Sequence, residues 1–393
     1  MSLVDYADRV LPADCDVATL VARVHDPVLG PCVASIRGDD VVDITSSVPT
    51  VSALLETADP VELVRNAAGE RRWGLPDLLR ATLSGTSGPM LLAPVDLQVL
   101  KAAGVTFVGS MLERVIEERA QGDPARAEEI RGKLGATLGT AISTVRPGSA
   151  EAAEVKRALL QEGMWSQYLE VGLGPDPEIF TKAPVLSAVG TGAAIGVLER
   201  SEWNNPEPEL VLVADSTGKP RGAMLGNDVN LRDFEGRSAL LLTEAKDNNA
   251  SCALGPFIRL FDEHYTIDDA RQTEIALDVT GQDDGFSLHG KNSVNQISRT
   301  FEELLAHTRG RHHQYPDGFV LFTGTLFAPT EDRDAPGQGF THHAGDVVSI
   351  SAERLGTLVN VVTSAEEAPP WTTGITDLVK SLVRRGALGQ VQS

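Results

Sequence analysis

The second half of the chain, from about residue 165, consists of short β-rich runs separated by Gly, Pro, Asp and Asn. Apolar runs of this kind between turn residues are typical of strands. The runs are WSQYLEVGLG, ELVLVADS, SALLLTEA, EIALDVTG, GFVLFTGTLF and DVVSISA. This half is therefore predicted to be mainly β, and the return of helical spacing in TGITDLVKSLVRRGAL predicts a closing helix.

The first half has a different pattern. The stretch VASIRGDDVVDITS predicts a hairpin with its turn at GDD, and helix-like SALLETADPVELVRNAA follows it, so residues 1–90 are predicted to form a small α+β unit. Residues 111–134 and 151–163 mix charges with apolar residues three or four apart, as solvent-facing helices do, and predict a helical insertion.

The length of 393 residues exceeds the usual size of one domain. We expect an α+β protein with an N-terminal domain of residues 1–90 and a larger domain of residues 91–393. The boundary is placed near GTSGPMLLAP.

Composition limits the partners. A formal charge of −21 would repel nucleic acid, so an anionic substrate has to be attracted locally, by a metal ion or a few positioned Lys and Arg.

The three cysteines are an odd number without zinc-type spacing, which favours a reducing, cytoplasmic setting. The acidic N-terminus and the lack of a stretch of about 18 apolar residues argue against a signal peptide and a membrane span.

Two glutamates, Glu207 and Glu209, stand directly in front of the apolar run LVLVA. On a strand, residues two apart point to the same face about 7 Å apart. Like charges there resist burial unless a divalent ion neutralises both. In GNDVNLRD, Gly226 and Asn227 suggest a turn that delivers Asp228 as a third oxygen ligand. Such a set suits Mg²⁺ with open positions for a chelating substrate, and Mn²⁺ accepts the same ligands. Alone, the Glu-x-Glu pair is also compatible with a solvated strand start.

The motifs PEPELVLV, GNDVNLRD, AKDNN, CALGP, LFTGT, GDVVSIS and LGTLVN, in this order over residues 90–365, resemble the fumarylacetoacetate hydrolase superfamily. The resemblance implies that the larger domain has the superfamily's mixed β-sandwich or β-roll fold. It also implies that Glu207, Glu209 and Asp228 bind a divalent ion. It also implies that Lys246 and Arg232 face the substrate's carboxylate or developing enolate, and that Thr325 donates its hydroxyl to a keto acid.

The upstream stretch AAGVTFVGSMLER departs from the superfamily's hydrolytic pattern. Thr106, Phe107 and Ser110 stand where that pattern has asparagine, tyrosine and the water-activating histidine, whereas Glu113 is kept. A serine without a neighbouring base cannot deprotonate water near neutral pH. With the metal retained, loss of the β-hydroxyl from an enolised 2-keto acid becomes the favoured chemistry.

The whole chain is similar to the superfamily's dehydratases of 2-keto-3-deoxy-pentonates, particularly the 2-keto-3-deoxy-D-xylonate type of oxidative pentose degradation. The implied product of these small sugar acids is 2,5-dioxopentanoate. The resemblance assigns proton transfer to Glu178 and Lys246, with Glu178 preferred. Ser110, in the position of the superfamily's histidine, and Lys182, which adds charge in the same stretch as Glu178, are expected beside the substrate. It also implies a homo-oligomer, either a dimer or a tetramer. The stereochemistry at C4, xylonate or arabinonate type, is left open.

Two alternatives stay open from the sequence. One is an enzyme that uses the same metal, either a C–C bond hydrolase of acylpyruvates or a 2-keto acid decarboxylase. The other is a non-catalytic metal-binding protein in which the acidic residues are structural.

Overall fold

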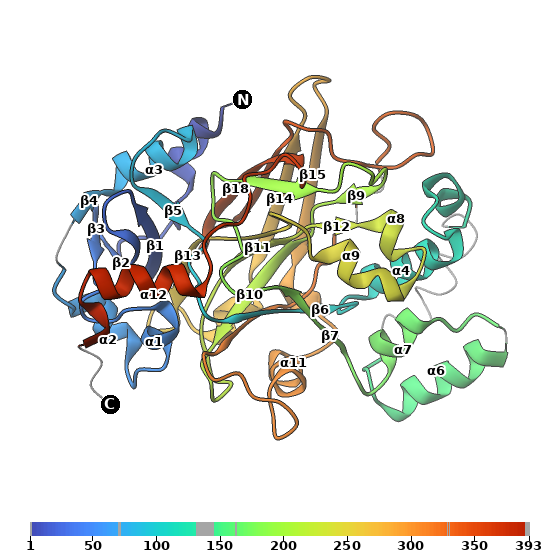
Figure 1. Ribbon diagram of the computed structural model, residues 1–393. Helices are drawn as coiled ribbons and strands as arrows, with labels where there is room; N and C mark the ends of the chain where they lie inside the picture. The colour runs from blue at the N-terminus through green and yellow to red at the C-terminus, as the bar shows by residue number, and fades with distance from the viewer. Residues whose placement is uncertain are drawn as a thin grey trace.

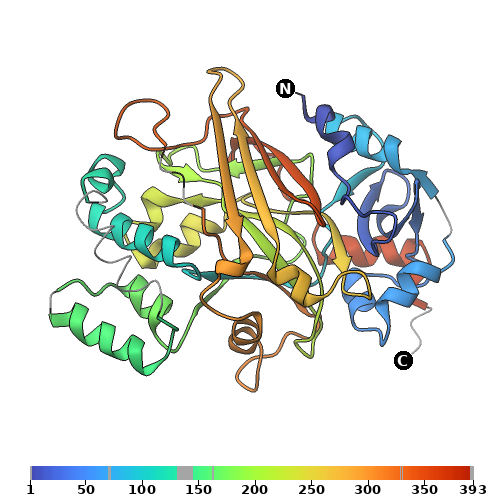
Figure 2. The same ribbon diagram turned by 180° about the vertical axis from the view of Figure 1, so that it is seen from behind.

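A computed structural model describes residues 2–69, 72–130, 145–161, 163–327, 329 and 331–389. A body of β-strands occupies the middle of the molecule (Figure 1). The N-terminal strands and the C-terminal helix α12 (Ile375–Arg384) lie at one end, and helices α4 (Val108–Ala120), α6 (Ala150–Gln161) and α7 (Gln167–Leu173) lie at the other. The reverse view shows the same separation (Figure 2). The predicted α+β class is confirmed.

Among the described residues, the larger sheet has 11 strands, in the order β4-β3-β2-β1-β13-β11-β10-β16-β6-β7, with β5 paired to β1. Its strands are β1 (Leu20–Asp26), β2 (Gly30–Arg37), β3 (Asp40–Asp43), β4 (Arg72–Gly74), β5 (Met90–Leu92), β6 (Val99–Gly104), β7 (Glu178–Ala183), β10 (Pro208–Ala214), β11 (Pro220–Asp228), β13 (Cys252–Leu260) and β16 (Phe319–Phe322). The neighbours β10 and β11 are antiparallel, whereas β16 and β6 are parallel.

A second sheet of five strands in the described part runs in the order β15-β14-β17-β18-β8. Its strands are β8 (Ala194–Val197), β14 (Glu274–Thr280), β15 (Ser287–Ser293), β17 (Val347–Ala352) and β18 (Gly356–Ser364). The short strands β9 (Asn204–Asn205) and β12 (Asn230–Leu231) pair with each other.

Strand β10 is buried along its whole length because both of its faces are covered. Leu210 and Leu212 point into a core shared with β14 and β17, whereas Val211 and Val213 point into a core shared with β13 and helix α1 (Val51–Leu55). A strand covered on both faces reads as a continuous apolar run, which explains LVLVA. Each fully buried side chain of this size contributes about 1.5–3 kcal/mol.

Two predicted strands are helices. The run WSQYLEVGLG contains α7, and SALLLTEA forms η2 (Ala239–Leu241) and α9 (Leu242–Lys246), so these two predictions were wrong. The Ser166 and Ser238 side chains each accept a hydrogen bond from a backbone N–H of the first turn. Such serine N-caps stabilise a helix start, and this signal outweighs a short apolar run whose period is ambiguous.

The remaining helices mostly cover the sheets and the ends of the molecule. They are η1 (Leu3–Arg9), α2 (Pro60–Asn66), α3 (Leu75–Ser84), α8 (Arg232–Glu235), α10 (Ile267–Arg271), η3 (Val294–Gln296), α11 (Phe301–Thr308) and η4 (Ala387–Gly389). None of the helices in the described ranges is long and apolar enough to cross a bilayer.

The N-terminal strands continue the larger sheet through the pairing of β1 with β13. Helix α12 returns to this end of the molecule, where Ser381 Oγ donates to Leu29 O at 3.0 Å and Arg385 pairs with buried Asp43 at 2.6 Å. The first and last parts of the chain therefore lie side by side (Figure 1). The division into residues 1–90 and 91–393 stays a prediction.

Candidate active site

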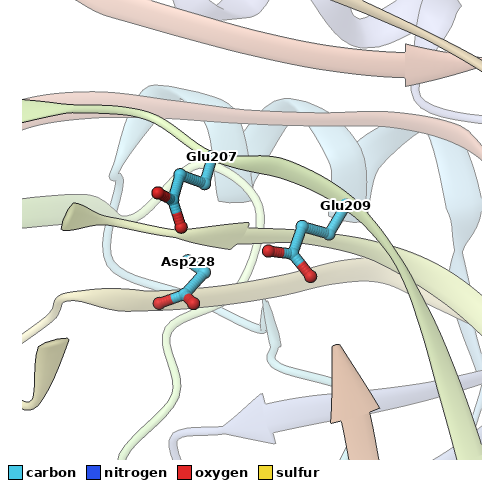
Figure 3. Close-up of side chains that lie close together, drawn as sticks. All are labelled: Glu207, Glu209 and Asp228. Atoms are coloured by element: carbon cyan, nitrogen blue, oxygen red, sulfur yellow. The ribbon is translucent and has the colours of Figure 1, made fainter. Parts of the chain in front are cut away.

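Three carboxylates meet where β10 begins and β11 ends. Ligand oxygens of Glu207, Glu209 and Asp228 all lie within 4.8 Å of one another, and all three residues are buried (Figure 3). The antiparallel register pairs Glu209 with Gly226 and Pro208 with Asn227, so Asp228 lies across from Glu207, whose carbonyl accepts its N–H at 3.1 Å. Strand pairing therefore assembles the cluster.

The predicted turn at Gly226 and Asn227 was wrong, because both residues belong to strand β11. Gly226 is required for packing instead: a Cβ there would lie 2.4 Å from Phe322 Cε1 and 2.6 Å from Val211 Cγ2. The Asn227 side chain accepts a hydrogen bond from Glu207 N at 3.0 Å. The two residues thus join the strands that carry the carboxylates.

Two buried lysines contact the cluster. Lys246 Nζ lies 2.5 Å from Glu207 Oε2 and 3.1 Å from Asp228 Oδ2, and Lys182 Nζ lies 2.9 Å from Asp228 Oδ1. Burial alone would lower the pKa of Lys246, but Asp228, Glu207 and Glu235 raise it above its ordinary value. Likewise, burial would raise the pKa of Asp228, but the two lysines lower it. These contacts favour the charged form of Lys246, and its assignment to proton transfer stays a prediction.

Glu209 has a different environment. Its Oε2 accepts a hydrogen bond from Gly324 N at 2.6 Å, and it has no ion-pair partner within the described ranges. Burial and the charges of Asp228 and Glu207 raise the pKa of Glu209 well above its usual range. A divalent ion among the three carboxylates would remove this penalty, because it neutralises them together. The donor set, hard carboxylate oxygens only, fits Mg²⁺ or Mn²⁺.

Arg114 of α4 connects this cluster to other buried acids. Its guanidinium lies 2.5 Å from Glu207 Oε1, 2.6 Å from Glu117 Oε2 and 2.8 Å from Glu235 Oε2. The sequence pattern predicted a solvent-facing helix here, which was wrong: Glu117 is 1% exposed. The connection between Arg114 and the cluster could not be predicted from spacing, because Glu235 lies in α8 and Glu207 directly precedes β10.

Glu178 begins β7 and lies beside the cluster. It pairs in register with Gly104 of β6, and it lines one cavity together with the three carboxylates. Burial and the negative charge of Glu235 raise the pKa of Glu178 to about 7. A carboxyl group with this pKa can accept or release a proton at neutral pH.

The cavity brings most of the predicted site residues together. Its lining includes the predicted residues Ser110, Glu178, Glu207, Glu209, Asp228, Lys246 and Thr325, together with Ala103, Gly104, Val105, Arg114, Phe180, Glu235 and Gly324. Sequence reasoning missed Arg114 and Glu235. The signal available for Glu235 was its position three residues after Arg232, just beyond the motif GNDVNLRD.

Arg232 and Lys182 are outside that lining in the described part of the chain. Arg232 is fully buried, with its guanidinium 2.6 Å from Glu117 Oε1 and stacked 4.2 Å from the centre of the Trp203 ring. Lys182 lies behind Asp228 and also donates to Val229 O at 3.2 Å. Their assignment to direct substrate contact stays a prediction, and the observed contacts hold Glu117 and Asp228 in place.

Replacing Gly104 by Ala should displace the Glu178 carboxylate. A Cβ at this position would lie 2.1 Å from Glu178 Oε2 and 2.9 Å from Cδ. Because a flexible side chain can swing away, stability should change by only about 1 kcal/mol. Turnover should fall roughly 10- to 100-fold through misplacement of the carboxylate. Steady-state kinetics and urea unfolding measure the two effects.

Gly88→Ala is the control, because a Cβ there meets nothing within 4 Å. Full turnover by the Gly104→Ala variant would remove Glu178 from the reaction.

The chain is similar to known proteins. Residues 152–363, more than half of the chain, match the family model described as the C-terminal domain of fumarylacetoacetate hydrolase. The chain belongs to the fumarylacetoacetate hydrolase family. Its fold is similar to that of a solved structure: 2-keto-3-deoxy-D-arabinonate dehydratase, complexed with magnesium and 2,5-dioxopentanoate, superimposes with a TM-score of 0.60 at 24% identity. The similarity covers 88% of this chain and 99% of that one.

Two relatives are more similar in sequence, over part of their length. The 2-dehydro-3-deoxy-D-arabinonate dehydratase of Saccharolobus solfataricus is 36% identical over 186 residues, which cover 47% of this chain and 58% of the relative. The probable 2-keto-3-deoxyxylonate dehydratase of Haloferax volcanii is 33% identical over 205 residues, which cover 52% and 66%. The chain thus spans less than two thirds of the length of each of these relatives.

Proposed function

We propose that this protein is a metal-dependent dehydratase that converts a 2-keto-3-deoxy-pentonate into 2,5-dioxopentanoate. One observation carries the proposal: the Glu207, Glu209 and Asp228 carboxylates share a cavity with Glu178, whose pKa is near neutrality. The names of the relatives supply the substrate class.

Glu207, Glu209 and Asp228 would hold Mg²⁺ or Mn²⁺. When bound, this ion supplies electrostatic stabilisation to negative charge that develops on a 2-oxo acid. Lys246 adds a fixed positive charge at the same place, and Gly324 N keeps Glu209 oriented. These residues stabilise charge, and the proton transfers fall to another group.

Glu178 is that group. In the proposed reaction its carboxylate removes a C3 proton and hydroxide leaves from C4 with a proton, so that one water is lost. A C5 proton then leaves while C3 is reprotonated, and the resulting enol becomes the terminal aldehyde. A carboxyl group with a pKa near 7 can act in both directions, as base and then as acid.

Hydrolysis is disfavoured by the position of Ser110. Its hydroxyl donates to Phe107 O at 2.9 Å, within its own helical turn, and Thr106 Oγ1 donates to Thr323 O at 2.7 Å. Both hydroxyls are engaged with backbone carbonyls, and a hydroxyl of this kind cannot replace the histidine that deprotonates water near neutral pH. We also propose that the enzyme acts in pentose degradation in the cytoplasm and that it forms a homo-oligomer.

The test is direct incubation of the purified protein with each C4 epimer of 2-keto-3-deoxy-pentonate and Mg²⁺. We expect 2,5-dioxopentanoate to form from at least one epimer, measured by coupling the aldehyde to a dehydrogenase. Acylpyruvates assayed in parallel should not be cleaved. Cleavage of an acylpyruvate without any dehydration would overturn the proposal in favour of a hydrolase.

A further inference from the structure

The lining of the candidate active site contains more acidic than basic side chains. Five carboxylates face two basic groups: Glu178, Glu207, Glu209, Asp228 and Glu235 against Arg114 and Lys246. If all of these groups are ionised, the lining carries three more negative charges than positive ones. A bound divalent ion would reduce this excess to one negative charge. The carboxylate of a bound 2-oxo acid adds a further negative charge.

The basic side chains at this site are already engaged. Lys246 contacts Glu207 and Asp228, and Arg114 contacts Glu207, Glu117 and Glu235. Behind the lining, Lys182 pairs with Asp228 and Arg232 pairs with Glu117. None of these four cations is therefore available for a second anionic group of a substrate. Glu235 also lines the cavity, where its Oε2 approaches Arg114, and its carboxylate adds negative charge to the lining.

We propose that Glu235, together with Glu178, selects 2-oxo acids with an uncharged tail and rejects those that carry a second carboxylate or a phosphate. The inference rests on the proposed function, because it assumes that the 2-oxo acid end of the ligand lies at the three metal-binding carboxylates. In a cavity walled by protein, repulsion between like charges is screened far less than in water.

A neutral, hydroxylated tail meets suitable partners in the same cavity. Ser110 Oγ uses its proton on Phe107 O and keeps its lone pairs for a hydroxyl donor. Thr325 Oγ1 accepts from Phe327 N at 3.1 Å and retains its own proton to donate. The carboxylates of Glu178 and Glu235 accept hydroxyl protons. A ligand tail with hydroxyl groups can therefore form hydrogen bonds with this lining, whereas an anionic tail is repelled by it.

The test compares two unreactive ligands of equal chain length, 2-oxopentanoate and 2-oxoglutarate, which differ by a terminal carboxylate. Their dissociation constants are measured by calorimetry on the full chain with saturating Mg²⁺. We expect 2-oxoglutarate to bind at least about tenfold more weakly. Glu235→Gln should reduce this affinity ratio at least about threefold by strengthening 2-oxoglutarate binding, because the amide removes the charge and keeps a side chain of the same shape beside Arg114.

Glu117→Gln is the matched control: it removes a carboxylate from the same Arg114 network but not from the cavity lining, and it should leave the ratio within about twofold. If Glu235→Gln fails to fold, Glu178→Gln should narrow the ratio in the same way. If the unaltered protein binds both acids equally, the proposed selectivity is wrong. The proposed dehydratase function is not affected by that result, because dehydration of a pentonate is measured separately. If neither acid binds in a Mg²⁺-dependent manner, the selectivity and the proposed function fail together.

Discussion

Replacing Asp228 by Asn should lower turnover by at least about 1000-fold and abolish the response to Mg²⁺. Loss of one of three carboxylate ligands removes several kcal/mol of charge stabilisation at the reacting centre, and each 1.4 kcal/mol is tenfold in rate. Glu207→Ala should have an equal or larger effect, because it also leaves Arg114 and Lys246 without a shared partner. Activity over a Mg²⁺ titration measures the first effect, and calorimetric titration of Mn²⁺ measures the binding itself.

Asp215→Asn provides a control on the same pair of strands. Asp215 is buried at the other end of β10, where it accepts from Arg221 Nε at 2.7 Å and caps the turn to β11. Its loss should lower the unfolding free energy by about 1–3 kcal/mol yet leave the dissociation constant for Mn²⁺ unchanged. Full activity of protein treated with EDTA and kept free of divalent ions would remove the metal from the mechanism.

Replacing Glu178 by Gln should reduce turnover by roughly 100- to 10,000-fold, the usual contribution of a positioned proton-transfer group. The amide is nearly isosteric but cannot accept a C3 proton. Mn²⁺ affinity should persist, because Glu178 is not among the three clustered ligands. Normal turnover of the Gln variant would contradict the assignment.

The pH profile gives an independent reading of Glu178. Its pKa is raised to about 7, so the neutral form persists to higher pH than for an ordinary glutamate. As a base it must be ionised, and kcat/KM should therefore fall on the acid side of its pKa, about tenfold per pH unit. A bound divalent ion favours the carboxylate, so this limb should lie below the pKa of the metal-free protein in both kcat/KM and kcat. The limb should be absent from the residual activity of Glu178→Gln.

Local patterns predicted the parts of the site that lie on one strand. Glu207 and Glu209 are two residues apart in front of LVLVA, and strand geometry alone places them on one face. The pattern GNDVNLRD suggested Asp228 as a third ligand, and the resemblance of the motifs added Lys246 and Glu178. The structure gathers all five residues around one cavity. The predicted strand run ELVLVADS and the closing helix of the tail were likewise found as β10 and α12.

Other features could not be predicted from local patterns. A short apolar run such as SALLLTEA is compatible with either a strand or a helix. Here the Ser238 side chain caps the first turn and favours the helix. Arg114 and Glu117 look like surface charges on an amphipathic helix, but α4 packs with its charged residues against Arg232 and Glu235. Such contacts depend on residues more than a hundred positions away, and spacing within one segment carries no information on them.

The sequence by itself determined that an acidic pair begins a strand covered on both faces, because alternation and continuous apolarity are properties of neighbouring residues. Only the tertiary structure decided that Asp228 faces Glu207, that Lys246 lies between them, and that Glu178 and Glu235 complete an acidic wall. The reason is that strand register and helix packing set these positions. Both are fixed by the simultaneous burial of side chains from distant segments, and no single segment specifies them.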